Sequence, residues 1–158
     1  MKLIFKDNKI ILCLNKIYIR NLDLNNKEEL YKYIKKTLHK LEKKYDLTLQ
    51  GYYSINLYID NNYGIIMEIT KEESSYLDYF ENSLDISIKI YKESFLYEVS
   101  DIIICNNYKT YINNNHIYIN IKKDISEKTM TKFIEKVIDI KYGVEKDTIL
   151  KKLKVLGW

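Results

Sequence analysis

The stretch from Gly51 to Thr70 constrains the fold more than any other, because two features of it independently predict a β-hairpin. Apolar side chains alternate with mostly polar ones along both arms, at Tyr53, Ile55, Leu57 and Ile59 and then at Ile65, Met67 and Ile69. This period of two is typical of half-buried strands. A three-residue loop, Asn62-Tyr63-Gly64, would set both apolar sets on one face and place Gly64 where a positive φ is needed. We therefore expect an antiparallel hairpin with one buried face.

Further short strands are predicted on both sides of this hairpin, at residues 3–5, 10–14, 17–19, 84–90, 95–99, 108–112 and 116–121. The segments 84–90 and 95–99 alternate in the same way around Lys92-Glu93-Ser94, which predicts a second hairpin. The last two strands flank a turn at Asn113-Asn114-Asn115, where asparagine tolerates left-handed backbone geometry.

Two long helices and one short helix are predicted from the spacing of apolar residues. The first spans Asn26–Asp46, is capped by Asn26, and has an apolar stripe at Leu30, Ile34, Leu38, Leu41 and Tyr45. The second spans Ser126–Tyr142, and its stripe is Met130, Phe133, Ile134, Val137 and Ile138. Gly143 suits the position just past its end, and a shorter helix begins at about Glu145.

These patterns predict the fold class α+β: antiparallel β-hairpins in one or two sheets, with two main amphipathic helices and a short C-terminal helix. The length of 158 residues suits a single α+β domain over 1–158, and two β-rich halves with a helix each, about 1–70 and 71–158, are the alternative. The expected core combines strand and helix residues: Ile55, Leu57, Ile59, Met67, Ile69, Ile86 and Ile88, with Leu30, Ile34, Leu38, Leu41, Phe133 and Val137.

The sequence predicts neither export nor membrane insertion. No apolar run approaches the roughly 18 residues of a membrane span. Lys6, Asp7 and Lys9 interrupt the N-terminal stretch that would be apolar in a signal peptide. With two cysteines, Cys13 and Cys105, and no export signal, we expect reduced thiols, a cytoplasmic location and no membrane partner.

Tyrosine is unusually frequent, with 16 tyrosines against 4 phenylalanines. Codons rich in A and T encode tyrosine as well as the abundant isoleucine, asparagine and lysine, so a low-GC genome explains part of the excess. Phenylalanine codons are equally rich in A and T, and yet phenylalanine is rare. The composition therefore indicates a preference for hydroxylated rings, which suit half-exposed surfaces.

Motifs for metal, phosphate or nucleophilic chemistry are not found in the sequence. His39 and His116 are far apart and the cysteines are isolated, so neither a metal site nor a cofactor is predicted. The four glycines are scattered, which excludes a P-loop and a dinucleotide fingerprint. Cys105 and His116, across a turn, are the only nucleophile and base near each other in sequence, and this pair is not favoured. An enzyme stays open only through residues assembled from distant positions.

Four tyrosines form the first candidate partner-binding surface: Tyr52, Tyr58, Tyr91 and Tyr118. Each falls on the strand face opposite the alternating apolar set, so neighbouring strands would gather the rings into an exposed aromatic patch. Tyrosines with few charges are typical of protein-binding surfaces. The leading hypothesis is therefore a non-catalytic protein–protein interaction module, such as a small regulator, inhibitor or adaptor. Alternatively, helices cover this face and the rings belong to a second core.

The distribution of charge supports an alternative function. Residues 1–44 carry 12 basic and 5 acidic side chains, residues 45–108 carry 3 and 11, and residues 109–158 carry 11 and 6. The basic helix 26–46 offers four lysines to a single-stranded nucleic acid, with surface tyrosines stacking on bases: Lys35, Lys36, Lys40 and Lys43. This alternative ranks second, because the net charge is only +4 and the candidate tyrosines mostly lie outside the basic segments.

Overall fold

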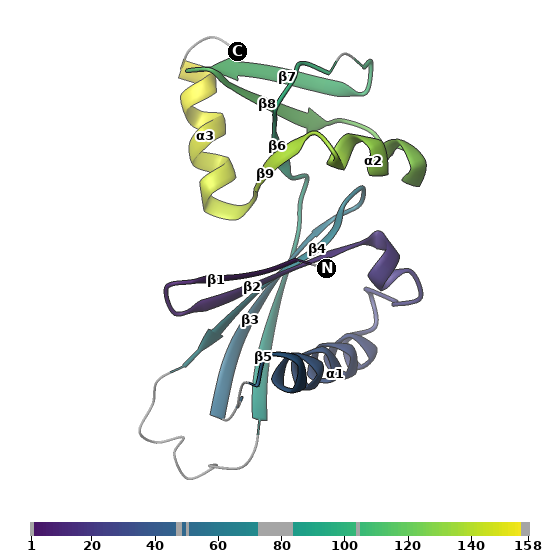
Figure 1. Ribbon diagram of the computed structural model, residues 1–158, viewed down its shortest axis with the longest axis vertical. Coiled ribbons are helices and arrows are strands. Elements are labelled where there is room, and N and C mark those ends of the chain that lie inside the picture. The colour runs from purple at the N-terminus through teal and green to yellow at the C-terminus, as the bar shows by residue number, and fades with distance from the viewer. Residues whose placement is uncertain (1, 47–48, 50, 73–83, 104, 156–158) are drawn as a thin grey trace. The chain divides into compact units, whose positions relative to one another are not determined.

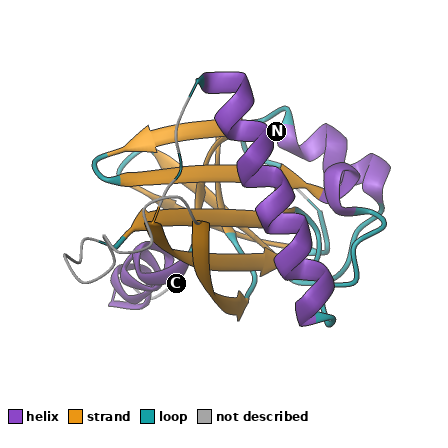
Figure 2. Cartoon of the chain, turned by 90° about the horizontal axis from the view of Figure 1, so that it is seen from below, coloured by secondary structure: helices purple, strands orange, loops and turns teal. Residues whose placement is uncertain are grey.

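The structure is a computed structural model that describes residues 2–46, 49, 51–72, 84–103 and 105–155 (Figure 1). This part of the chain contains two antiparallel sheets and three α-helices, so the predicted α+β class is confirmed. Figure 2 shows the same helices and strands distinguished by colour. No described helix combines the length and the apolar composition that crossing a lipid bilayer requires.

The chain forms two compact units. The first comprises residues 1–57 and 65–90, and the second comprises residues 58–64 and 91–158. The boundary passes through the predicted central hairpin. Its tip therefore belongs to the second unit, whereas most of both arms belongs to the first.

The larger sheet has five strands in the order β1-β2-β4-β3-β5. Their bounds are Lys2–Lys6 (β1), Lys9–Asn15 (β2), Gly51–Asp60 (β3), Gly64–Lys71 (β4) and Leu84–Lys92 (β5). The predicted hairpin is β3 with β4, and Gly64 has the expected positive φ of 130°. Its loop comprises residues 61–63, one residue earlier than predicted.

Helix α1, Lys27–Tyr45, buries four of the five predicted stripe residues, whereas the fifth, Tyr45 at the last position of the helix, is 40% exposed. The side chain of Asn26 caps it, because its Oδ1 accepts the N–H of Glu29 at 3.2 Å. The four buried stripe residues are Leu30, Ile34, Leu38 and Leu41. The helix ends at Asp46, whose backbone is left-handed with φ 51°. Since the stripe is buried, the lysine-rich side of α1 faces solvent.

Residues 17–19 are not the predicted strand. They lie in a short 3-10 helix, η1 (Lys16–Ile19). The Oδ1 atom of Asn15 accepts the N–H of Ile17 at 3.1 Å, and this local bond stabilises a turn in place of an extended chain. A run of three apolar residues is too short to show a periodicity, so the sequence does not distinguish a strand from a helical turn here.

The second sheet has four strands in the order β7-β8-β6-β9. The elements of this region are β6 (Leu96–Val99), β7 (Tyr108–Asn113), β8 (His116–Ile121), α2 (Glu127–Ile134), β9 (Val137–Lys141) and α3 (Gly143–Val155). β7 and β8 form a hairpin whose turn residues, Asn114 and Asn115, both have positive φ. The expected use of asparagine in this turn is confirmed.

The predicted second hairpin, residues 84–90 with 95–99, is wrong. β5 lies beside β3 in the larger sheet, whereas β6 lies between β8 and β9 in the other sheet. The N–H of Glu93, between the two strands, donates to the carbonyl oxygen of Ile59 at 2.9 Å. The connecting segment is thus bonded to the end of β3 and does not fold back on β5.

The predicted helix Ser126–Tyr142 is too long. Helix α2 ends at Ile134, and the residues after it form the edge strand β9, which pairs with β6. Three of the five residues of β9 are β-branched and therefore fit a pleated strand better than a helix. Gly143 consequently begins α3 instead of following the end of α2.

Most of the predicted core is confirmed. The predicted side chains that are buried are Leu30, Ile34, Leu38, Leu41, Ile55, Leu57, Ile59, Met67, Ile69, Ile86 and Phe133. Ile88 and Val137 are half-buried. Val137 is less covered than predicted because it lies on the edge strand β9 and not in a helical stripe.

Leu57→Asp should abolish the cooperative unfolding of the first unit. Leu57 is fully buried, and an unpaired buried charge costs about 3–5 kcal/mol, which is comparable with the whole stability of a small domain. Circular-dichroism melting measures the loss. Asn56→Asp is the control, because it adds the same charge at a half-buried neighbouring position. An unchanged melt of the Leu57→Asp protein would contradict the core described for β3.

Candidate functional site

Two of the four predicted tyrosines contact each other in the second unit. The rings of Tyr58 on β3 and Tyr91 on β5 are stacked, with centroids 5.1 Å apart and an interplanar angle of 17°. Tyr142, just before α3, also contacts Tyr58, with centroids 4.7 Å apart and an angle of 53°. Tyr58 is therefore the central ring of three.

These three rings are only partly covered. Tyr91 is 43% exposed, and Tyr58 and Tyr142 are half-buried. Val144, in the first turn of α3, is 82% exposed. We name Tyr58, Tyr91, Tyr142 and Val144 the tyrosine patch. It presents apolar rings to solvent together with hydroxyl groups that can donate and accept hydrogen bonds.

Gly143 brings the start of α3 close to the central ring. Its φ is 58°, in the left-handed region that favours glycine. A Cβ atom at this position would lie 3.2 Å from Cε1 of Tyr58. Both the backbone conformation and the close contact with the ring therefore favour glycine here.

A carboxylate anchors the same end of the helix. Oε1 of Glu93 accepts the N–H of Gly143 at 2.7 Å, and its Oε2 lies 3.8 Å from Nζ of Lys146. Lys146 also donates from Nζ to the carbonyl oxygen of Ser94 at 2.9 Å. The helix dipole further favours a negative group at this terminus. The backbone behind the tyrosine patch is thus held in place, so the rings need little ordering when they bind.

Tyr118 does not lie on an exposed surface, so this part of the prediction is wrong. It is 9% exposed and packs with Leu96, Tyr111 and Leu153. Leu153 belongs to α3, which covers this face of the second sheet. For Tyr118 the structure therefore agrees with the alternative prediction, in which helices cover the tyrosines and the rings belong to a second core. Burial, followed by the nearby carboxylate of Glu98, raises the pKa of Tyr118 above its ordinary value.

Tyr52 is half-buried and belongs to the first unit. Sequence reasoning found Tyr58 and Tyr91 but missed Tyr142 and Val144. The sequence pattern places Tyr142 at the end of the predicted helix 126–142. The sequence signal for this site is Gly143, which is predicted to follow the end of the second helix but in the structure begins α3 with a positive φ.

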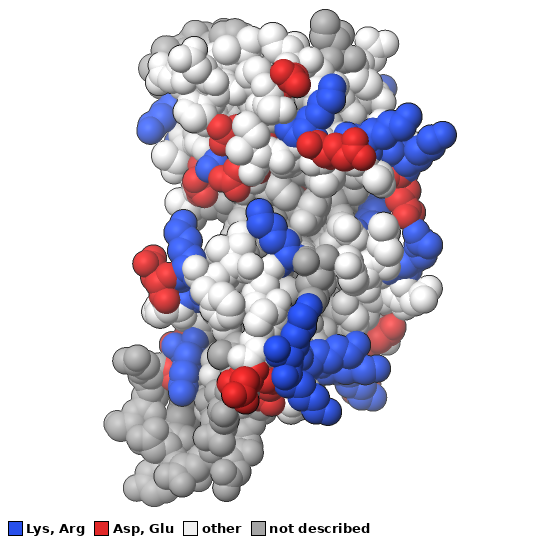
Figure 3. Space-filling model, in the orientation of Figure 1, with Lys and Arg blue, Asp and Glu red and all other residues white. Residues whose placement is uncertain are grey.

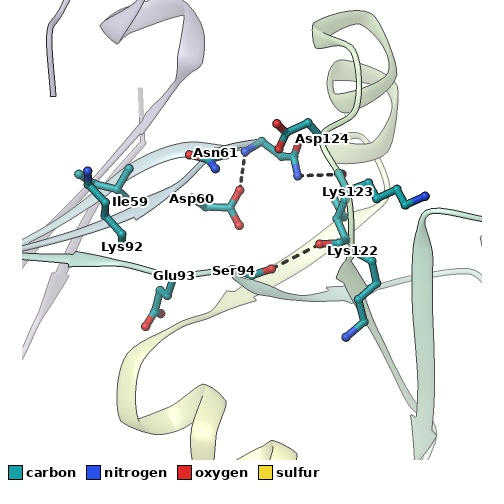
Figure 4. Close-up of a pocket in the computed structure, with 11 residues that line it drawn as sticks. Ile59, Asp60, Asn61, Lys92, Glu93, Ser94, Lys122, Lys123 and Asp124 are labelled. Atoms are coloured by element: carbon teal, nitrogen blue, oxygen red, sulfur yellow. Dashed lines mark hydrogen bonds between the residues drawn. The ribbon is translucent and has the colours of Figure 1, made fainter. Parts of the chain in front are cut away.

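The carboxylate of Asp60 organises the loop next to the patch (Figure 4). Asp60 is 3% exposed. Its Oδ1 accepts the N–H groups of Asn62 at 2.6 Å and Tyr63 at 3.0 Å, and its Oδ2 accepts the N–H of Phe95 at 2.7 Å. One side chain therefore closes the β3–β4 loop and binds it to the segment that leads into β6.

A polar pocket of about 320 Å³ lies beside Asp60 (Figure 4). One lining residue, buried Asn62, stabilises the fold: it donates from Nδ2 to the carbonyl oxygen of Lys123 at 3.4 Å and accepts the N–H of Ile125 at 3.0 Å. In Figure 4 the side chains of Lys92, Lys122 and Lys123 extend in different directions. The pocket therefore lacks a set of charges that converges on one ligand atom.

Aromatic contacts continue from the patch into the core of the second unit. The ring centroid of Phe95 lies 6.1 Å from that of Tyr142 and 6.5 Å from that of Tyr97, which in turn is 5.1 Å from that of Phe133. The Tyr97 hydroxyl is buried and has no hydrogen-bond partner in the described part of the chain. Burial and then the charge of Asp60 raise the pKa of Tyr97 well above its ordinary value.

His116 pairs with a carboxylate that sequence reasoning did not consider. Its Nδ1 lies 2.5 Å from Oε1 of Glu98, the residue opposite Tyr118 in the pairing of β6 with β8. The imidazole of His116 also stacks on the Tyr118 ring, with centroids 6.1 Å apart. His116 and Glu98 are 18 positions apart in the chain, and only the pairing of β6 with β8 brings them together.

The lysines predicted to contact nucleic acid lie on α1. Lys36, Lys40 and Lys43 are exposed, whereas Lys35 is half-buried and places its Nζ 4.8 Å from the ring centroid of Tyr31. Figure 3 shows lysine side chains gathered where Figure 1 places α1. Three of the four predicted lysines are thus available to a ligand.

No protein-family model matches this chain, and no curated protein or solved structure matches it either. Within the described ranges, no group of three or more histidine, cysteine, aspartate or glutamate residues is arranged to hold a metal ion.

Asp60→Ala should destabilise the second unit by about 3 kcal/mol, because it leaves three buried N–H groups without an acceptor. Asp60→Asn retains part of the acceptor capacity and should cost about half as much. Urea denaturation measures both values, with the exposed loop variant Asn61→Ala as the control. A value for Asp60→Ala within about 0.5 kcal/mol of the parent protein would contradict the role given to this carboxylate.

Gly143→Ala should destabilise the second unit by about 1–2 kcal/mol, because alanine is strained at this φ and its Cβ presses on the Tyr58 ring. Gly143→Asn should cost less, since asparagine tolerates the left-handed region and only the contact with the ring remains. Thermal denaturation of the two variants separates the cost of backbone strain from the cost of the contact with the Tyr58 ring. Equal stability of both variants and the parent protein would refute the close packing at Gly143.

Proposed function

We propose that this protein is a non-catalytic protein–protein interaction module, such as a small regulator, inhibitor or adaptor, and that the tyrosine patch is its contact surface. The observation that carries the proposal is a cluster of three partly exposed tyrosine rings at the start of α3, in which Tyr91 stacks on Tyr58 and Tyr142 is tilted against it.

The composition of the patch supports this role. Tyrosine is among the residues that contribute most to binding at protein interfaces, where a large ring fills a pocket of the partner and its hydroxyl is hydrogen-bonded. Tyr91 and Val144 expose the apolar area that such a contact buries.

The rigidity of the patch also supports this role. Tyr58 is held between neighbouring rings and the backbone of Gly143, and Glu93 holds Gly143 in turn. A surface that is already ordered loses less conformational entropy on binding, which increases affinity for a given contact area. We further propose a cytoplasmic location and a function that needs no cofactor.

Tyr91→Ala should weaken capture of the partner about 30-fold, which corresponds to about 2 kcal/mol for a central interface residue. A photo-cross-linking amino acid placed at position 144 in cells identifies the partner as a discrete adduct. The yield of this adduct, compared with and without Tyr91→Ala, measures the loss.

The matched control is Tyr18→Ala, which removes an equally exposed tyrosine from the first unit. It should leave the adduct unchanged, and circular-dichroism melts should show that both variants are folded. Equal adduct yields for Tyr91→Ala and the parent protein would rule out the tyrosine patch as the contact surface.

A further inference from the structure

A row of four lysines runs along the solvent side of α1. Lys32, Lys36, Lys40 and Lys44 follow one another at intervals of four residues, so they share one side of the helix at steps of about 6 Å along its axis. All four side chains are exposed. We name these residues the lysine stripe.

The lysine stripe is not neutralised within the described chain, because none of its members forms an ion pair with another described residue. The carboxylate of Glu42 is engaged elsewhere: it accepts the N–H of Leu49 at 3.0 Å and lies 3.5 Å from Nδ1 of His39. Like charges four residues apart destabilise a helix. A polyanion bound along the stripe would relieve this repulsion.

Two exposed aromatic rings stand at the C-terminal end of the stripe. Tyr45, the last residue of α1, is 40% exposed, and Phe5 on β1 is 58% exposed. Their ring centroids are 6.3 Å apart in an edge-to-face arrangement. The Nζ atom of Lys44 lies 5.5 Å from the Tyr45 ring centroid. We name Phe5 and Tyr45 the ring pair; Phe5 belongs to the basic segment 1–44, and Tyr45 directly follows it.

We propose that the lysine stripe and the ring pair form a binding site for single-stranded nucleic acid. The stripe contacts successive phosphates, and the ring pair stacks on a base near one end of the strand. This site goes beyond the proposed function, because it lies in the first unit and takes a different class of ligand.

The surroundings of the stripe favour a single strand over other polyanions. The apolar stripe of α1 is buried, so the helix has no apolar face to insert into a lipid surface. Exposed rings beside a row of lysines suit a ligand that presents both phosphates and flat, unpaired groups, as a single strand with its bases does. Charge complementarity and stacking together therefore select this ligand.

Fluorescence anisotropy of a labelled oligouridylate of about 16 nucleotides, at several salt concentrations, tests the proposal. Four phosphate contacts predict a slope of log affinity against log salt of about −2.8. The triple variant Lys36→Gln, Lys40→Gln and Lys44→Gln should flatten this slope by about 2 and weaken binding at low salt by at least about tenfold.

A matched control removes the same charge from exposed positions of α2 and α3: Lys128→Gln, Lys132→Gln and Lys152→Gln. This variant should leave the slope unchanged if the stripe makes the contacts. Cross-linking through the tyrosine patch should be unaffected by either triple variant, which separates a failure of this site from a failure of the proposed function.

The contribution of the ring pair to affinity can be measured separately from that of the lysine stripe. Phe5→Ser should weaken binding about tenfold, the effect of one lost base stack, without changing the salt slope. Ile17→Ser, at an equally exposed apolar residue of η1, is its control.

Asp46→Asn keeps the left-handed end of α1 but removes the carboxylate that follows Tyr45, so it should tighten binding about twofold.

Lack of binding at low salt would overturn the proposal. Equal losses in the two triple variants would also overturn it, because the response would then reflect net charge alone. Binding to anionic lipid vesicles but not to oligouridylate, with the same dependence on the stripe, would assign the surface to a membrane and overturn it as well. Circular-dichroism melts establish that each variant is folded.

Discussion

The carboxylate of Asp60 is the interaction on which the second unit most depends. A charge at 3% exposure is costly unless hydrogen bonds satisfy it, and three backbone N–H groups do so here. Two donors belong to the β3–β4 loop, and the third belongs to Phe95, which lies 35 residues away in the chain. A local turn and a distant strand are thereby held by one side chain.

The tyrosine patch follows from this arrangement. With the tip of the hairpin fixed, the neighbouring Tyr58 is held against Tyr91 and beside the start of α3. A second anchor holds the same helix, because Nζ of Lys141 donates to Asp139 at 2.8 Å and to Glu145 at 2.9 Å. Burial lowers the pKa of Lys141, but these two hydrogen bonds outweigh burial and raise it above its ordinary value.

The second sheet also shows where many tyrosines are used. Helices cover both of its faces: Tyr97 meets Phe133 of α2, while Tyr118 packs with Leu153 of α3. The expectation that tyrosines occupy half-exposed positions suits Tyr58 and Tyr142 but is wrong for these buried rings. A tyrosine ring can lie in a core when its hydroxyl reaches solvent or a partner. The Tyr97 hydroxyl, without a partner among the described residues, is the costly exception.

The sequence by itself determined the elements whose interactions are local. The stripe and cap of α1, the β3–β4 hairpin with Gly64, and the turn at Asn114 and Asn115 were predictable, because each depends on residues two to four positions apart. The exposed lysines of α1 were predictable for the same reason. Only the tertiary structure decided which strands pair, since β6 and β9 present backbone groups that many strands satisfy equally well. The contacts of Tyr58 with Tyr142 and of Phe5 with Tyr45 join residues far apart in the chain, so no local periodicity encodes them.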